Sequence, residues 1–197
     1  MWDEKFAKYD FMFGTDPAQG LVRHVAHLHA QGKTLAVADG EGRNSVYLAE
    51  QGFDVEAMDS SQVGIAKAKA LCEARGVHVN YELADIFAYD WPDGLYDNVV
   101  AVFIQFAPPE SWHQIFAGMM KALRPGGVLY LHGYTPKQID YGTGGPPLAS
   151  HLYTQDDLAH QFADMDIVVN HAYEAVLDEG PGHKGQSALI DFVAIKR

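Results

Sequence analysis

Glycines and acids stand just after the first predicted strand, where they could hold a ligand. The strand, residues 34–38, runs into Asp39-Gly40-Glu41-Gly42 and then into a helix. Glycine lets the backbone approach a ligand closely, and the first turn of a helix offers free amide donors. By itself this Gly-x-Gly segment is equally consistent with an ordinary glycine-rich turn.

A second acid, Asp59, makes a ligand-binding role for the glycine loop more specific. Asp59 ends the strand predicted at 53–58 and follows Gly40 by 59 − 40 = 19 positions. Nucleotide-binding α/β folds bind ribose hydroxyls with an acid at that distance, and their ligands lie beyond the carboxyl ends of the strands. Asp85, after the third strand, and Phe103, at the fourth, should reach the same crevice. Taken singly, Asp85 is equally a helix cap and Phe103 equally a core residue.

Alternating strands and helices must position these residues. An early helix is predicted to begin at Asp16-Pro17 and to end at Gly32. Short connections between the elements predict an α/β, doubly wound, Rossmann-like sheet that is mostly parallel. The further strands are predicted at 77–83, 98–106 and 128–131, and the helices at 43–51, 62–75 and 110–123.

The C-terminal part departs from this alternation. Two strand-like runs, 167–176 and 188–195, are joined by the turn-rich residues 178–185. This pattern predicts a hairpin, so the last strand should run antiparallel to its neighbour. No Pro/Ser-rich linker or repeat interrupts the sequence, and we expect one domain over residues 1–197.

Composition narrows the function. Hydrophobic residues make up 48% of the chain, but no apolar run approaches the ~18 residues of a membrane span. The net charge is −12, with 14 basic residues scattered among 26 acids. Because binding to phosphate backbones needs clustered Lys and Arg, a nucleic-acid partner is not expected. One cysteine, Cys72, allows no internal disulfide, and a cytoplasmic location without a membrane partner is expected.

Ten histidines raise the question of a metal. His24, His27 and His29 fall on the early helix, but only the first two share a face and no nearby acid completes a ligand set. We therefore predict no metal site and solvated helix histidines.

Several segments together resemble a known family, the class I S-adenosylmethionine-dependent methyltransferases, and within it the small proteins related to tellurite-resistance and thiopurine methyltransferases. The resemblance spans nearly the whole chain. Its segments are Trp2-Asp3-Glu4-Lys5-Phe6, Phe13-Gly14-Thr15-Asp16-Pro17, Gly40-Glu41-Gly42-Arg43-Asn44-Ser45, Asp59-Ser60-Ser61, Tyr96-Asp97-Asn98, Leu123-Arg124-Pro125-Gly126-Gly127 and Tyr141-Gly142-Thr143-Gly144-Gly145.

The resemblance implies a seven-stranded sheet of order 3-2-1-4-5-7-6 whose last strand is antiparallel, in agreement with the hairpin. It implies S-adenosyl-L-methionine as cofactor and S-adenosyl-L-homocysteine as product. The glycine loop would hold the methionine part, Asp59 the ribose, and Asp85 with Ile86 the adenine. The full cofactor set implied is Asp39, Gly40, Glu41, Gly42, Asn44, Asp59, Ser60, Asp85, Ile86 and Phe103.

One departure from the family pattern concerns the first loop. The family's Asp-Leu-Gly-Cys-Gly is represented here by Ala36-Val37-Ala38-Asp39-Gly40, so the acid stands inside the loop. Asp39 could take over the contact with the cofactor's ammonium group. The alternative is a non-catalytic, cofactor-binding regulatory or scaffold module.

Other enzyme classes fit less well. Ser45 replaces the third glycine of a dehydrogenase fingerprint, and no Tyr-x-x-x-Lys pair is present. Nucleic-acid base methylation is disfavoured because Phe103-Ile104-Gln105-Phe106 stands where an Asn-Pro-Pro-Tyr-like segment would be expected.

The predicted substrate end involves segments far apart in the sequence. His151 and His183 are expected to converge above the methyl group as candidate catalytic residues, together with Tyr141. Phe11 and Phe13, from an N-terminal cap at residues 1–16, would form an apolar lid. The acceptor would be a small molecule with a sulfur, selenium, tellurium, oxygen or nitrogen nucleophile, and the protein a monomer or homodimer. Histidine exchanges protons near neutral pH, although both could merely hold Gly-rich loops.

Overall fold

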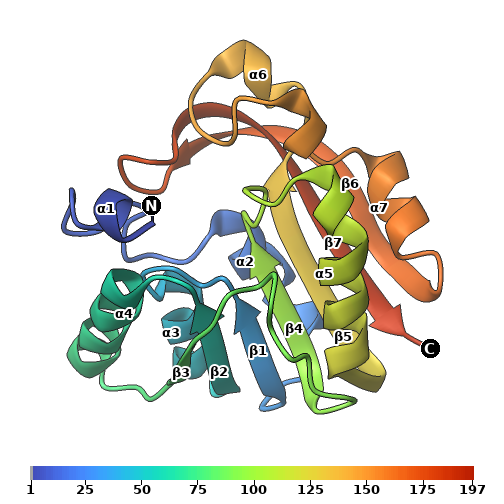
Figure 1. Ribbon diagram of the computed structural model, residues 1–197, viewed down its shortest axis with the longest axis horizontal. Helices are drawn as coiled ribbons and strands as arrows, with labels where there is room; N and C mark the ends of the chain where they lie inside the picture. Colours follow the sequence, from blue (N-terminus) through green and yellow to red (C-terminus); the bar gives the residue numbers. More distant parts are fainter. Residues whose placement is uncertain (1) are drawn as a thin grey trace.

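The computed structural model describes residues 2–197, so Met1, the first residue of the expected cap, lies outside the described residues. A single seven-stranded sheet forms the centre, in the order β3-β2-β1-β4-β5-β7-β6 (Figure 1). β1 to β5 are parallel, and β7 runs antiparallel to both β5 and β6. The predicted order and the antiparallel last strand are both confirmed. The strands are β1 (Lys33–Val37), β2 (Asp54–Asp59), β3 (Asn80–Leu83), β4 (Tyr96–Val102), β5 (Leu123–Tyr134), β6 (Met165–Asp178) and β7 (Lys184–Lys196).

Helices cover the two faces of the sheet in separate layers (Figure 1). One hydrophobic cluster joins the sheet to α5 and α7 through Phe116 and Leu158. The other joins it to α2, α3 and α4 through Leu21, Val46 and Leu71. No helix in residues 2–197 is both long enough and apolar enough to cross a membrane. The helices are α1 (Trp2–Phe6), α2 (Gln19–His24), η1 (Val25–His27), α3 (Arg43–Glu50), α4 (Gln62–Arg75), α5 (Pro109–Ala122), α6 (Gln138–Tyr141), η2 (Ala149–His151) and α7 (Gln155–Gln161).

α4 has the bounds predicted for it because its ends carry local signals. The side chain of Ser61 accepts a hydrogen bond from the Gly64 amide at 3.0 Å, which caps the first turn. Gly76 ends the helix with φ +68°, and the next amide, that of Val77, returns to the Cys72 carbonyl at 3.1 Å. Val77 therefore belongs to the helix end, and β3 begins at Asn80 rather than at 77 as predicted.

The early helix differs from the prediction. It begins at Gln19, two residues after Pro17, and passes into 3-10 geometry at Val25. Two amides at its start are satisfied by other elements: Ala18 N donates to Asn44 Oδ1 at 3.0 Å and Gln19 N to Glu179 Oε1 at 2.9 Å. Tertiary partners therefore replace the predicted Asp16-Pro17 start.

β4 is also shorter than the predicted strand at 98–106. It ends at Val102, and Phe103 has φ +56°, in the left-handed region that non-glycine residues rarely adopt. The apolar composition of residues 103–106 reflects burial around the end of the strand. β5, in contrast, is longer than the predicted 128–131 because it pairs with β4 on one side and β7 on the other.

Candidate functional site

A cavity of about 820 Å³ lies beyond the carboxyl ends of the parallel strands. Its size falls within the range of roughly 300–1,000 Å³ usual for small-molecule sites. The loops after β1, β2, β3 and β4, the N-terminal helix α1, and the loops after β5 and β6 all contribute to its lining. The cavity thus lies where the sequence analysis placed the crevice.

The loop after β1 is shaped by positive φ angles at three of its five residues. Ala38 has φ +48°, Gly40 +64° and Gly42 +91°. A Cβ on Gly40 would lie 3.2 Å from the ring of Phe6, and one on Gly42 would lie 2.5 Å from the Ala68 Cβ. Gly40 lines the cavity, whereas Gly42 is required where α3 approaches α4 and does not line it.

Asp39 also lines the cavity, but its carboxylate is engaged within the loop. It accepts hydrogen bonds from the Ser45 hydroxyl and from the Ser45 amide, the latter at 3.2 Å, so it fastens the loop to the first turn of α3. Burial raises the pKa of Asp39 to about 6, although the bonds from Ser45 oppose the shift. A carboxylate has about four acceptor sites, so these bonds leave capacity for a ligand.

Glu41 does not line the cavity. Its Oε2 accepts the Met12 amide at 2.7 Å and the Phe13 amide at 3.3 Å, and its Oε1 pairs with Lys67 at 2.9 Å. Asn44, which does line the cavity, accepts from Ala18. Both residues therefore hold the N-terminal segment over the site, a role that a one-dimensional motif does not reveal.

Asp59 lies at the end of β2 with only 8% of its surface exposed. Its Oδ2 accepts the Gly40 amide at 2.8 Å and its Oδ1 accepts the Ser61 amide at 2.7 Å. Burial raises the pKa of this carboxyl above its ordinary value. Asp59 and the neighbouring Ser60 both line the cavity, so the acid and the glycine loop predicted to act together are joined directly.

Asp85 and Ile86 line the same cavity from the loop after β3. Asp85 Oδ1 accepts the Phe87 amide at 3.0 Å, and Ile86 is buried. A buried apolar side chain beside a carboxylate at a strand end is suited to a flat base with polar edges.

α1 covers this end of the cavity. Trp2, Asp3 and Phe6 line it, and none of the three was assigned a role in the sequence analysis beyond the cap segment. Asp3 accepts hydrogen bonds from the Ser61 hydroxyl and, at 3.1 Å, from the Val63 amide, while Lys67 binds the carbonyl of Phe6. The aromatic and acidic residues at the very start of the sequence were the available signal.

Rings form the opposite end of the cavity. Phe103, Tyr134 and His183 meet there, with centroids 4.2 Å apart for Phe103 and His183 and 4.7 Å for Phe103 and Tyr134. Phe13 packs on His183 at 4.4 Å. We call these four residues the ring wall. Phe103 was predicted as a cofactor residue, and the structure places it here.

His151 and His183 both line the cavity, as predicted, but their surroundings differ. His151 Nδ1 lies 3.3 Å from the carbonyl oxygen of Gln105, which accepts a hydrogen bond from that nitrogen. His183 is 6% exposed and its buried Nδ1 has no hydrogen-bond partner in residues 2–197. Burial, with the charge of Arg43 next in effect, holds the pKa of His183 well below its ordinary value.

Two predicted residues do not join this group. Tyr141 donates its hydroxyl hydrogen bond to Glu174 on β6 and does not line the cavity. Phe11 packs in the core cluster beside α3 and α4 and lies under the Lys67 ammonium, 5.7 Å from its ring centre. The expectation that both reach the substrate end is therefore wrong, because helix α6 turns outward and Lys67 holds the N-terminal segment against α4.

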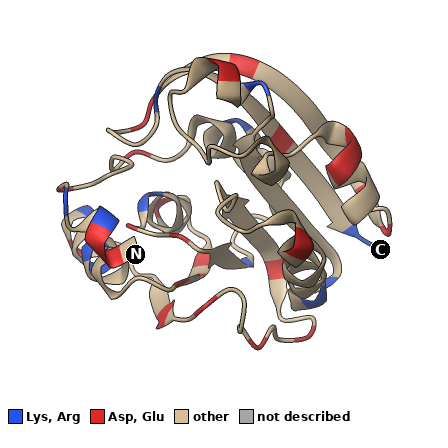
Figure 2. Cartoon of the chain, turned by 45° about the horizontal axis from the view of Figure 1, so that its top comes forward, with Lys and Arg blue, Asp and Glu red and all other residues tan. Residues whose placement is uncertain are grey.

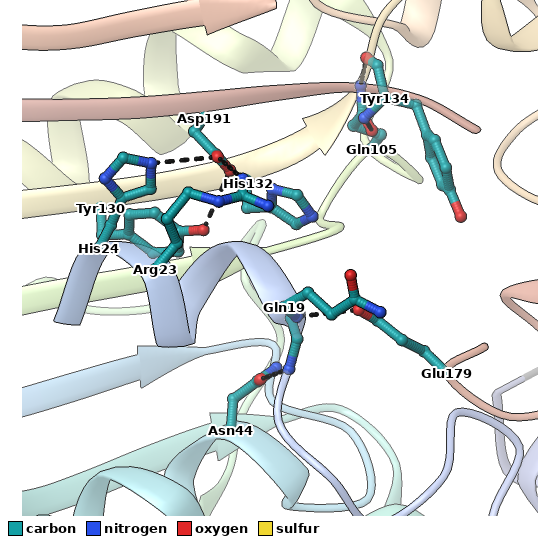
Figure 3. A network of polar contacts seen from close by, with 11 residues as sticks. Gln19, Arg23, His24, Asn44, Gln105, Tyr130, His132, Tyr134, Glu179 and Asp191 are labelled. Atoms are coloured by element: carbon teal, nitrogen blue, oxygen red, sulfur yellow. Dashed lines mark hydrogen bonds and ion pairs between the residues drawn. The ribbon is translucent and has the colours of Figure 1, made fainter. Parts of the chain in front are cut away.

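Arg43 and Glu179 form a buried ion pair that the sequence analysis missed. Arg43 Nη1 lies 2.8 Å from Glu179 Oε2, and both side chains are less than a tenth exposed. Glu179 Oε1 also accepts the Gln19 amide (Figure 3). The pair connects the start of α3, the C-terminal hairpin and α2. Its two partners are 136 residues apart in the chain, so no local pattern indicates it.

A second network of polar contacts is centred on the buried Asp191 (Figure 3). Asp191 on β7 accepts from Arg23 at 2.8 Å and Tyr130 at 3.2 Å, and it lies 2.6 Å from His132 Nδ1 and 3.1 Å from His24 Nε2. Burial opposes the shift, but the hydrogen bond with His132 and the charges of His132, His24 and Arg23 lower the pKa of Asp191 to about 2.

The early histidines are thus not merely solvated, since His24 contacts Asp191. No cluster of three or more His, Cys, Asp or Glu side chains within residues 2–197 is arranged to hold a metal ion.

Comparison with known proteins agrees with the fold. Residues 34–127 match a family model described as a methyltransferase domain. The phosphatidylethanolamine N-methyltransferase of Cereibacter sphaeroides is 32% identical over 131 residues, covering 65% of this chain and 64% of the relative. The tRNA 5-carboxymethoxyuridine methyltransferase of Escherichia coli K12 is 31% identical over 145 residues, covering 66% and 54%. The chain therefore spans less than two thirds of the length of these curated relatives.

Among solved structures, TehB from Haemophilus influenzae aligns with a TM-score of 0.76 and 23% identity over 100% of this chain and 67% of TehB. In this protein, the glycine loop after β1 and the acid at the end of β2 meet at one cavity, beside a sheet of order β3-β2-β1-β4-β5-β7-β6. The domain match identifies residues 34–127 as a methyltransferase domain, and the fold around them is that of the class I S-adenosylmethionine-dependent methyltransferases.

Proposed function

We propose that this protein transfers a methyl group from S-adenosylmethionine to a small-molecule nucleophile. The observation that carries the proposal is the hydrogen bond from the Gly40 amide to Asp59, both of which line a cavity large enough for a ligand. A carboxylate that is already oriented by two backbone amides can accept hydrogen bonds from two adjacent hydroxyls of a ribose. Around it, the glycine loop admits close approach of a ligand to the backbone.

The residues present fit such a cofactor. Asp59 would hold the ribose, Asp85 and Ile86 the adenine, and Gly40 with Asp39 the methionine part, under the cover of α1. When bound, the cofactor supplies a methyl group already activated by a positively charged sulfur. The chain's tasks are then to align the acceptor, to exclude water and to take up a proton.

For the proton we favour His151 over His183. Because Nδ1 of His151 donates to the Gln105 carbonyl, its Nε2 is left as the acceptor, which is the arrangement of an oriented general base. His151 Nε2 would take the proton that the acceptor gives up when its lone pair attacks the methyl group that the cofactor would supply. His183 would serve as a neutral part of the wall.

A nucleic-acid acceptor is not part of this proposal, although relatives include tRNA methyltransferases. The net charge of −12 weakens any grip on phosphates, and Figure 2 shows Lys and Arg scattered among the acidic residues. We also propose one domain over residues 1–197, a cytoplasmic location and a monomer or homodimer. The competing candidate is a cofactor-binding module without turnover, favoured by the engagement of Asp39 with Ser45.

Calorimetry with S-adenosylhomocysteine tests the binding half of this proposal. Asp59→Ala should weaken affinity at least about tenfold, because a hydrogen bond to a charged group contributes ~1.5–3 kcal/mol. Asp54→Ala, at the exposed opposite end of the same strand, is the matched control and should bind like the wild type. Equal affinity of all three proteins, with folding verified, would rule out the ribose assignment.

Turnover is tested separately with labelled S-adenosylmethionine and a panel of thiols, phenols, amines, selenite, tellurite and transfer RNA. Label in a small molecule supports the enzyme, and label in RNA overturns the choice of acceptor. Tight binding without any turnover supports the module.

A further inference from the structure

Charge at the two ends of the cavity is unequal. The acids that line it, Asp3, Asp39, Asp59 and Asp85, come from α1 and from the loops after β1, β2 and β3, at the proposed cofactor end. The opposite end is lined by rings and neutral groups, including Gln105 and the prolines of the loop after α6. The acceptor therefore enters a place with no unopposed carboxylate.

Neither cation that lines the cavity offers a free charge at the ring wall. Of the Lys and Arg residues described, two line the cavity. Arg43 is paired at 2.8 Å with Glu179, and Lys5 lies over the Trp2 ring, 4.3 Å from its centre, on α1. An oxyanion at the ring wall would meet no free positive charge, and burying an uncompensated charge is strongly unfavourable.

The polar members of the wall remain neutral as well. Burial raises the pKa of the Tyr134 hydroxyl, so it keeps its proton, and burial lowers the pKa of His183, so its imidazole stays uncharged near neutral pH. Both contribute a buried polar atom, Tyr134 Oη and His183 Nδ1, that lacks a partner in residues 2–197.

Phe103 presents its ring from a strained backbone that other elements hold in place. Its φ is +56°, and its amide donates to the His132 carbonyl at 2.8 Å. The His132 ring packs edge-on against it at 4.6 Å and is fixed in turn by Asp191 (Figure 3). A strained backbone of this kind persists only where many surrounding contacts hold it. Such residues are concentrated at active sites and ligand-binding sites.

We propose that the methyl acceptor is an uncharged, flat aromatic compound that lies against Phe103, rather than an oxyanion or an aliphatic thiol. The inference rests on the proposed function, since it names the substrate of that same site. A neutral acceptor avoids the cost of burying charge, and an aromatic one gains offset or edge-on contacts with the ring wall.

The test compares 2-naphthol with trans-2-decalol, two neutral alcohols with the same fused carbon skeleton of which only the first is flat and aromatic. Selenite and tellurite are the anionic probes. Binding is measured by calorimetry with each protein saturated with S-adenosylhomocysteine, after its affinity for that ligand has been determined. We expect 2-naphthol to bind about threefold to tenfold more tightly than trans-2-decalol, the range that aromatic contacts add. Neither oxyanion should bind more tightly than 2-naphthol.

Phe103→Leu is the decisive variant because leucine is apolar and carries the same penalty at positive φ, but has no ring. It should reduce the preference for 2-naphthol to less than about twofold. Tyr9→Leu, at an exposed aromatic residue outside the cavity, is the control and should keep the full preference.

Three results would overturn the inference: equal binding of the two alcohols to the wild type, tighter binding of an oxyanion, or an unchanged preference in Phe103→Leu. A wild-type protein that does not bind S-adenosylhomocysteine would be a separate result. It would overturn the proposed function itself, and the inference with it.

Discussion

At the scale of single residues, the two cavity histidines differ in their hydrogen bonding, and we propose different roles for them on that ground. His151 is oriented by the Gln105 carbonyl, whereas His183 is enclosed by rings and has an unpartnered Nδ1. We predict that His151→Ala lowers kcat by about 10²–10⁴-fold, the usual contribution of a general base. The loss should shrink at high pH, where the acceptor ionises without assistance.

The contrast with His183→Ala checks this assignment. That variant should raise KM for the acceptor more than it lowers kcat, because it removes wall surface and not the base. The pH–rate profile should show an inflection where the general base titrates. If His183→Ala removes that inflection and His151→Ala retains it, the two roles are reversed.

At the scale of secondary-structure elements, the approach of α3 to α4 depends on Gly42. Its φ is +91°, and an added Cβ would lie 2.5 Å from the Ala68 Cβ. Gly52 has a similar φ of +88° but nothing within 4 Å of an added Cβ. Gly52→Ala should therefore cost only the conformational penalty of about 1–2 kcal/mol. Gly42→Ala should cost at least ~1 kcal/mol more, since overpacking adds to that penalty.

Urea unfolding of the two alanine variants measures the difference. Gly42→Ala should also weaken binding of S-adenosylhomocysteine, because the displaced α3 carries the glycine loop with it. If both substitutions have equal free energies of unfolding, steric contact with α4 is not what requires Gly42.

At the scale of the whole molecule, Asp191 connects α2, β5 and β7 from a fully buried position (Figure 3). Asp191→Asn should lower the free energy of unfolding by about 3–5 kcal/mol, as expected when one partner of a buried charge network is removed. Asp178→Asn breaks an exposed pair with Lys184 and should cost less than ~1 kcal/mol.

The same network predicts a pH dependence. The folded pKa of Asp191, about 2, lies below its unfolded value, so its contribution is complete above about pH 4 and is lost as pH falls toward 2. The wild type should lose this stability over that interval, and the difference between wild type and Asp191→Asn should narrow there. A constant difference from pH 7 to pH 2 would show that ionisation of Asp191 is not involved.

Features that depend on near neighbours in the chain could be predicted from the residue pattern. The bounds of α4 follow from Ser61 and Gly76, and the hairpin of β6 and β7 follows from the turn-rich residues between two apolar runs. The clustering of Gly40, Asp59 and Asp85 could also be predicted from the sequence, because parallel strands bring their carboxyl ends to one edge of the sheet.

Tertiary structure alone decided what depends on distant partners. Glu41 and Glu179 are acids in loops by sequence, yet one holds residues 12 and 13 and the other pairs with Arg43. Tyr141 points to Glu174 although its segment leaves from the cavity edge, and the left-handed Phe103 ends β4 within an apolar run. Side-chain direction and backbone strain are set by the summed contacts of elements far apart in the chain, and a linear pattern of residue types does not contain those contacts.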